Sequence, residues 1–161
     1  MNEIITSSIW KLFGWLPGFI LKRIYPPRRF SELIVIDVRP RHDPVQLNFG
    51  EIPHVDVWLQ ITNRSPFQVE LDRVHVVVHY GVGTTDLYNL ERVKFGSNTS
   101  QDIYVRGFLT DSYAISGSNQ PDDVECSILV SAEFNSRITN FGKRTGELRG
   151  IKPRVINKRA R

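Results

Sequence analysis

The sequence predicts an all-β protein, an antiparallel sandwich of about seven strands with an amphipathic helix at its N-terminus. Two observations lead to this fold class. Several segments alternate apolar and polar residues with a period of two, the pattern of half-buried strands, and turn residues separate them. No segment after residue 32 shows a sustained helical period. Such a set of short strands favours two packed antiparallel sheets.

Residues 1–25 are expected to form the helix. On a helical wheel, apolar residues of the stretch 4–21 fill one half, with Trp10 and Leu21 as apolar exceptions on the other half. A wide apolar face followed by basic residues is typical of a helix lying at the headgroup boundary of a membrane. The predicted membrane- or partner-binding residues are Ile9, Trp10, Leu12, Phe13, Trp15, Leu16, Phe19, Ile20, Lys22, Arg23, Arg28 and Arg29.

The same helix has other interpretations. A spanning helix needs about 20 mostly apolar residues, but Lys11, Gly14, Pro17 and Gly18 interrupt this run. A cleaved signal peptide is disfavoured because no small-x-small site follows and most basic residues come after the apolar run. Membrane contact, flat or as a shallow bent insertion, and packing on its own domain or a second subunit remain open. If the helix inserts, the excess of Lys and Arg after it places the domain on the cytoplasmic face; otherwise we expect a cytoplasmic protein.

A linker rich in Pro and Arg is predicted at 26–32, followed by the sandwich domain at 33–151. Its first strand is expected at 33–39, closed by Pro40 and Pro44. The clearest strand is 54–62, because its odd-numbered residues are all apolar from 55 to 61 and its even-numbered residues are mostly polar. Turn residues occupy 63–66.

The later elements follow the same logic. A long strand is predicted at 67–80 and is ended by Gly81-Val82-Gly83. Weaker strands are expected at 87–95 and 101–106, and 107–114 fits either a short helix or a bulged strand. A strong alternation marks 124–134, and a short final strand is expected within 136–151.

One motif resembles a known family. A strand ends in Ile61-Thr62-Asn63, a turn carries Pro66-Phe67, and the next strand opens with Val69-Glu70-Leu71. This resembles the immunoglobulin-like β-sandwich domains of the late embryogenesis abundant and water-stress (WHy) proteins. Those domains usually show Asn-Pro-Asn at the turn, whereas this chain has Asn63-Arg64-Ser65-Pro66. The resemblance implies a binding, stabilising or accessory role and carries over no catalytic residues.

Charge divides the chain into three parts. Residues 1–41 contain seven basic and three acidic residues, for a net charge of +4. Residues 42–136 contain five basic and thirteen acidic residues (−8), and residues 137–161 contain nine basic and one acidic residue (+8). An acidic body with basic ends argues against a nucleic-acid-reading face on the body and favours an anionic partner at the ends.

The 152–161 segment is expected to be a disordered basic tail that assists membrane binding through Lys152, Arg154, Lys158, Arg159 and Arg161. A solvated tail without function is the simpler interpretation. RNA binding by the tail is less favoured, because no stacking aromatic residues are interleaved with the basic residues after Phe141.

Residues suited to catalysis are few. The single cysteine, Cys126, falls on an inward strand face, where a thiol behaves as a small hydrophobe. His75 and His79 share a strand face about 13 Å apart, too far to share one metal ion. Common nucleophile and phosphate-binding motifs are absent from the sequence. We therefore expect no enzymatic activity, no cofactor and no metal site.

Trp58 is the unusual residue of the body, because it lies on the polar face of its strand. Either the N-terminal segment or residues 107–115 cover it, or it is an exposed contact for a partner. Together these observations predict a non-enzymatic accessory or adaptor domain at a membrane surface, with another protein or a second copy as a further partner. The alternative is a soluble sandwich subunit whose N-terminal helix mediates oligomerisation or docking in a larger assembly.

Overall fold

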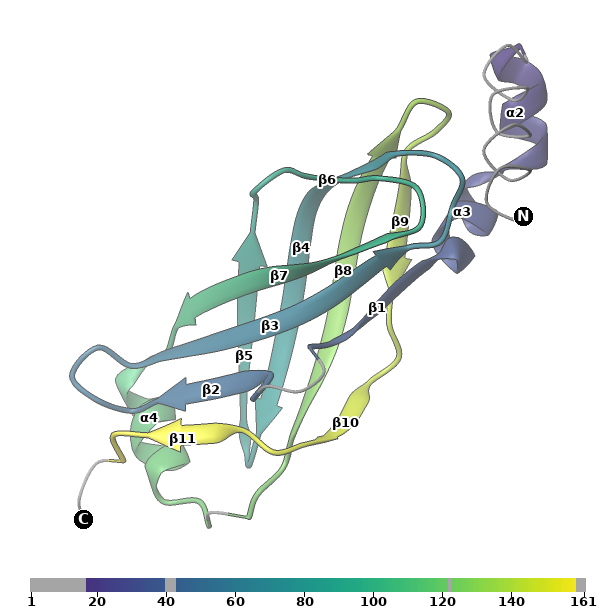
Figure 1. Ribbon diagram of the computed structural model, residues 1–161. Coiled ribbons are helices and arrows are strands. Elements are labelled where there is room, and N and C mark those ends of the chain that lie inside the picture. Colours follow the sequence, from purple (N-terminus) through teal and green to yellow (C-terminus); the bar gives the residue numbers. More distant parts are fainter. Residues whose placement is uncertain (1–16, 40–42, 122, 159–161) are drawn as a thin grey trace.

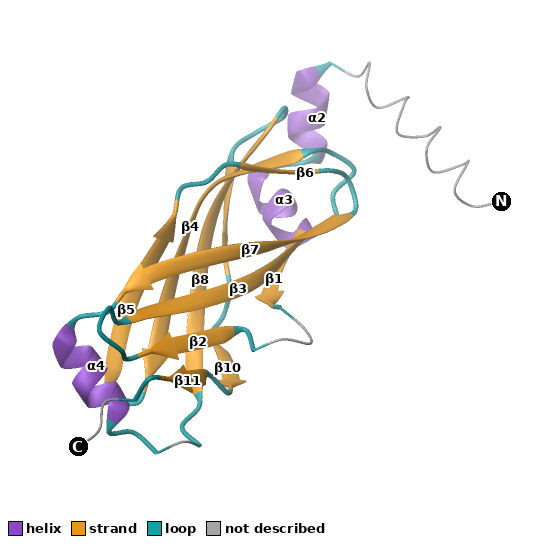
Figure 2. Ribbon diagram, turned by 60° about the vertical axis from the view of Figure 1, so that its left-hand side comes forward, coloured by secondary structure: helices purple, strands orange, loops and turns teal. Residues whose placement is uncertain are grey.

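Two β-sheets packed face to face make up the body of the protein, with short helices at both ends (Figures 1 and 2). The computed structural model describes residues 17–39, 43–121 and 123–158. The predicted all-β sandwich is confirmed, although eleven strands rather than about seven are present in the described residues.

The first sheet has five strands in the order β1-β3-β2-β11, and β7 pairs with the other side of β3. Its strands are β1 (Ile34–Val38), β2 (Val45–Asn48), β3 (His54–Asn63), β7 (Thr99–Phe108) and β11 (Arg154–Ile156). The second sheet has the order β10-β8-β4-β5, with β6 paired to β4 and β9 to β8. It comprises β4 (Val69–Tyr80), β5 (Gly83–Asn89), β6 (Val93–Phe95), β8 (Cys126–Ser136), β9 (Phe141–Arg144) and β10 (Leu148–Ile151).

The core lies between the sheets and follows the predicted alternation. Val55, Val57, Leu59 and Ile61 of β3 are fully buried, and their even-numbered neighbours face outward. The inward residues of β4 and β8 meet them from the second sheet. Each strand therefore divides its residues between core and surface as a period of two requires.

Asn63 explains the motif at the turn between β3 and β4. Its side chain is fully buried, and Nδ2 donates to the carbonyl oxygens of Phe67 (2.7 Å) and Gly96 (2.8 Å). Its Oδ1 accepts from the Ser65 amide at 2.9 Å. One buried amide thus joins the β3–β4 turn to the end of β6, which compensates for the loss of hydrogen bonds to water.

The predicted linker at 26–32 is wrong. Helix α2 (Gly18–Ile24) is followed by a second helix, α3 (Pro27–Leu33). Pro27 occupies the first turn of α3, where its missing amide proton costs nothing. Phe30 is fully buried, and its ring lies 5.1 Å from that of Phe141 and 5.9 Å from that of Phe67. An aromatic cluster therefore fixes this segment to the sandwich.

The predicted disordered tail is also wrong for residues 154–156. They form β11, which pairs in parallel with β2, and the Phe49 amide donates to the Ile156 carbonyl at 3.1 Å. Two further elements differ from expectation. The weak strand predicted at 87–95 is two strands, β5 and β6, and residues 111–118 form the helix α4 (Asp111–Ser118), capped by the Thr110 side chain.

Candidate functional site

Helices α2 and α3 form the end of the sandwich at which the described chain begins (Figure 1). Leu21 and Tyr25 are buried there, while Phe19 is 73% exposed. Lys22, Arg23, Arg28 and Arg29 are exposed, and Ile20 is half-buried. The other residues predicted for this surface lie outside the described residues: Ile9, Trp10, Leu12, Phe13, Trp15 and Leu16.

The basic side chains of this end are partly engaged by the protein itself. Arg29 donates to the Ile24 carbonyl at 3.0 Å, and its guanidinium carbon lies 5.0 Å from the Tyr25 ring centroid. Arg28 forms an exposed ion pair with Glu32 at 3.4 Å, and an exposed pair of this kind contributes little to stability.

A fifth basic residue at this end was missed from the sequence. Exposed Arg64 follows β3, and its amide donates to the Leu33 carbonyl at 2.9 Å, which places it beside α3. The signal for Arg64 was weak because 31 residues of sequence separate it from Leu33. We refer to Lys22, Arg23, Arg28, Arg29 and Arg64 as the N-terminal basic end.

The described part of the basic tail is not part of this surface. Strand β11 lies near α4, at the end of the sandwich opposite α2 and α3, in both views (Figures 1 and 2). Lys158 Nζ donates to the Gln120 carbonyl at 3.0 Å, and exposed Arg154 and Lys152 belong to or adjoin β11. Arg159 and Arg161 lie outside the described residues.

A polar network occupies the solvent face of the first sheet. Asp56 is only 2% exposed although it points outward. Its carboxylate accepts from Tyr104 Oη at 2.6 Å and from Arg106 at 2.7 and 3.2 Å. Burial by itself raises the pKa of Asp56, but the hydrogen bonds from Arg106 and Tyr104 outweigh it, so that the pKa lies below its usual value. Asp56 therefore holds Tyr104 and Arg106 in place.

Trp58 lies next to this network and is half-buried. Its ring centroid is 5.3 Å from that of Tyr104. Residues 107–115 do not cover it, because Gly107 pairs with Val55 and the chain then continues into α4. Trp58 lines a shallow pocket of about 230 Å³ together with Arg39, Asp43, Gln46 and Arg154.

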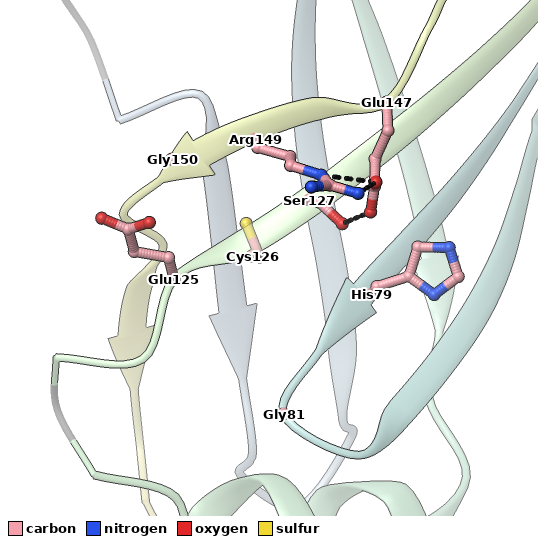
Figure 3. Close-up of a pocket in the computed structure, with 8 residues that line it drawn as sticks. All are labelled: His79, Gly81, Glu125, Cys126, Ser127, Glu147, Arg149 and Gly150. Atoms are coloured by element: carbon pink, nitrogen blue, oxygen red, sulfur yellow. Dashed lines mark hydrogen bonds and ion pairs between the residues drawn. The ribbon is translucent and has the colours of Figure 1, made fainter.

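A second pocket, of about 280 Å³, lies where β4, β8 and β10 meet (Figure 3). Glu147 accepts a hydrogen bond from Ser127 Oγ at 2.7 Å and from Arg149, contacts that lower its pKa. Its lining residues are His79, Gly81, Glu125, Cys126, Ser127, Glu147, Arg149 and Gly150. Ser127, Glu147 and Arg149 thus bind one another.

Cys126, at the same pocket, is 2% exposed, as the alternation predicted. Burial raises the pKa of its thiol to about 12, which leaves almost no thiolate at neutral pH. The thiol is therefore a poor nucleophile.

The histidines on β4 have separate partners. His75 contacts Asp86 at 2.7 Å and stacks on Tyr88 at 4.5 Å, and His79 contacts Thr84 at 2.9 Å. Within 17–39, 43–121 and 123–158, no group of three His, Cys, Asp or Glu residues could hold a metal ion. Over the same described ranges, no helix has the length and apolar character that crossing a membrane requires.

No protein-family model matches the sequence, and no curated protein is significantly similar to it. Solved structures share its fold at low identity. Structural genomics target SoR45 aligns over 73% of this chain and 84% of its own, with 12% identity and a TM-score of 0.50. A candidate ApaA protein from Bordetella pertussis aligns over 71% and 86%, with 11% identity and a TM-score of 0.44. A candidate late embryogenesis abundant protein aligns over 91% and 86%, with 14% identity and a TM-score of 0.44. The likeness to SoR45 shows a shared β-sandwich fold.

Proposed function

We propose that this protein is a non-enzymatic accessory domain that attaches to an anionic membrane surface by its N-terminal end. The observation that supports it is the N-terminal basic end itself, where five exposed cations and the exposed ring of Phe19 occur at the same end of the sandwich. An apolar contact flanked by cations matches an anionic headgroup layer, in which each basic residue near the surface contributes about 1 kcal/mol. The basic residues after the apolar stretch favour the cytoplasmic face.

The arrangement of the ends supports an upright attachment. Strand β4 has 12 residues, so at about 3.3 Å per residue the sandwich is about 40 Å long. A cation at the far end is then several Debye lengths from the surface and contributes little. The C-terminal basic residues therefore face away from the membrane in this proposal, where they and the rest of the sandwich remain accessible to another protein or a second copy.

The family assignment is part of the same proposal. The motif between β3 and β4, with Asn63 at its centre, supports a relationship to the late embryogenesis abundant and water-stress domains. An accessory or stabilising role would be consistent with that class.

Vesicle co-sedimentation of the full chain tests the proposal, on neutral and on anionic lipid. A variant with Lys22→Glu, Arg23→Glu and Arg28→Glu should bind anionic vesicles on the order of 100-fold more weakly, from about 1 kcal/mol per residue. A matched control carries Lys152→Glu, Arg154→Glu and Lys158→Glu at the opposite end and should bind like the unmodified protein. These variants keep Leu21 and Tyr25, which a truncation at residue 28 would remove from the core.

Two results contradict this proposal. If both triple variants lose vesicle binding equally, binding does not depend on which end of the sandwich carries the cations. A full chain that binds neither kind of vesicle would assign the N-terminal helix to a protein interface, the soluble-subunit alternative.

A further inference from the structure

Beside Trp58, strand β3 changes its pairing partner on one side. Strand β1 pairs with β3 as far as Val38 opposite Leu59, and β2 begins with Val45 opposite Val57. Trp58 lies between these two paired segments. Its backbone is still paired, because its carbonyl accepts from Arg39 (3.0 Å) and its amide donates to Pro44 (2.8 Å). The Trp58 pocket therefore lies beside the point where the pairing of β3 passes from β1 to β2.

Both hydrogen-bond donors and hydrogen-bond acceptors line this pocket. Gln46 and Arg154 are neighbours in register across β2 and β11, and Arg39 and Asp43 complete the rim. These side chains provide amide and guanidinium donors as well as amide and carboxylate acceptors. The pocket can thus bind a ligand whose polar groups both donate and accept hydrogen bonds.

Among the described residues that line the pocket, the charges nearly balance. Two arginines line it, but Asp43 lines it too, and Arg39 already pairs with Asp102 at 2.9 Å. A carboxylate or phosphate ligand would meet little excess positive charge. A purely apolar ligand would leave the polar walls without partners, which is costly.

The indole of Trp58 is held in place without a ligand. Tyr104 packs against it, and Asp56 fixes Tyr104 through the 2.6 Å hydrogen bond. Asp56 also binds Arg106, which lies opposite it on β7. A fixed aromatic surface binds a ligand at a lower entropic cost than a mobile one.

We propose that this pocket binds a saccharide, with a pyranose ring lying against Trp58. A pyranose ring combines an apolar C–H face, which suits an indole, with hydroxyl groups that donate and accept hydrogen bonds. Its hydroxyl groups would bind Gln46, Arg154 and Asp43. The pocket lies on the flank of the sandwich, so this inference is independent of membrane attachment at the N-terminal basic end.

Chemical-shift titration of the ¹⁵N-labelled full chain tests the inference. The Trp58 indole cross-peak is identified by its loss in Trp58→Phe, and the probes are glucose, galactose, mannose, N-acetylglucosamine, maltotriose and chitotriose. At least one sugar should move this cross-peak saturably, with a Kd in the millimolar range or tighter. Gln46→Ala and Arg154→Gln should each weaken that binding on the order of tenfold, since each removes about one hydrogen bond.

Tyr88→Ala is the matched control, because it removes an exposed aromatic ring from the solvent face of the other sheet. It should leave sugar binding unchanged. If none of the six sugars moves the Trp58 cross-peak, or if citrate moves it and the sugars do not, the saccharide assignment is overturned. If Trp58→Phe fails to fold, Trp10→Phe and Trp15→Phe identify the other two indole cross-peaks and assign that of Trp58 by elimination.

Discussion

At the scale of single residues, the solvent face of the first sheet owes its order to one buried carboxylate. Asp56 is ionised and nearly inaccessible, and it binds Tyr104 and Arg106 from the neighbouring strand. Hydrogen bonds to a charged group stabilise by about 1.5–3 kcal/mol, and a partner left unpaired is costly. The network therefore stabilises the pairing of β3 with β7 as well as the position of the Trp58 ring.

Asp56→Asn should lower the free energy of unfolding at pH 7 by roughly 2 kcal/mol. Because the folded pKa is lowered, the stabilisation by Asp56 is present above the unfolded pKa of about 3.9 and is lost as the pH falls through the folded pKa. The unmodified protein should thus lose more stability than the variant between mildly and strongly acidic pH. Urea unfolding at a series of pH values measures both slopes, and parallel curves would contradict the role of Asp56.

Cys126 gives a second prediction at this scale. With a pKa of about 12, its thiol should react with a thiol reagent at pH 8 at least on the order of 100-fold more slowly than an ordinary exposed cysteine. In denaturing urea the reaction should become fast. Rapid labelling of the native protein would contradict this prediction and mean that β10 separates readily from β8 at Cys126.

At the scale of elements, the two ends of the chain were harder to predict than the middle. Strands β3, β4 and β8 are 10 to 12 residues long, so their alternation extends over several repeats. Strands β2 and β11 have only four and three residues, too few to show a period. Helix α3 was missed because Pro26-Pro27 resembles a linker, although proline is also favoured where a helix starts.

The candidate sites also contain residues that the sequence singled out and residues that it did not. Trp58 stood out because one aromatic residue broke the polar pattern of its strand face. Its partners did not, since Tyr104 and Arg106 are 48 and 50 residues away from Asp56. Strand register brings these residues together, and local sequence does not encode register. The parallel pairing of β11 with β2 could not be predicted from the sequence for the same reason.

Helix α3 should behave as part of the core. Phe30→Ala should cost about 3–5 kcal/mol of stability, because the substitution leaves a cavity among Tyr25, Phe67 and Phe141. Arg28→Ala, on the exposed side of the same helix, should change stability by less than about 0.5 kcal/mol. Chemical denaturation measures the stability of both variants. If Phe30→Ala also has only a small effect, this segment behaves as a linker rather than as part of the core.

Strand β11 should likewise be needed for stability. A chain that ends after Ile151 loses the half-buried Val155 and Ile156 and uncovers the edge of β2. We expect a loss of roughly 2 kcal/mol from the apolar area that is no longer buried. A chain that ends after Lys158 keeps β11 and should match the full chain in a thermal melt. Equal melting of all three proteins would show that β11 adds nothing.

At the scale of the whole molecule, the sandwich has two chemically different ends. Helices α2 and α3 carry cations and the exposed Phe19. The opposite end, where α4 lies (Figure 2), exposes Ile52 between β2 and β3, Phe108 at the end of β7 and Ile115 of α4. If the N-terminal basic end contacts the membrane, this second end points away from it. The molecule would then present its flanks and its α4 end to other proteins.

Neutron reflectometry on a supported anionic bilayer measures this orientation. An upright domain should give a protein layer about 40 Å thick, the length of β4. A domain lying on its side would instead give a layer of about 25 Å, because the two sheets lie about 10 Å apart and the side chains on their outer faces add to the thickness. In that case the cations of β11 could also reach the surface.

The parallel pairing of β11 with β2 affects how the protein folds during synthesis as well as the stability of the folded state. Asn157 Nδ2 donates to Asn48 Oδ1, a residue 109 positions earlier, so the outer edge of β2 lacks this covering until residue 157 has left the ribosome. Contacts between such distant segments slow folding. During synthesis, an uncovered strand edge can pair with other chains. Refolding after dilution should consequently be slow and sensitive to protein concentration, with β11 closing the sheet.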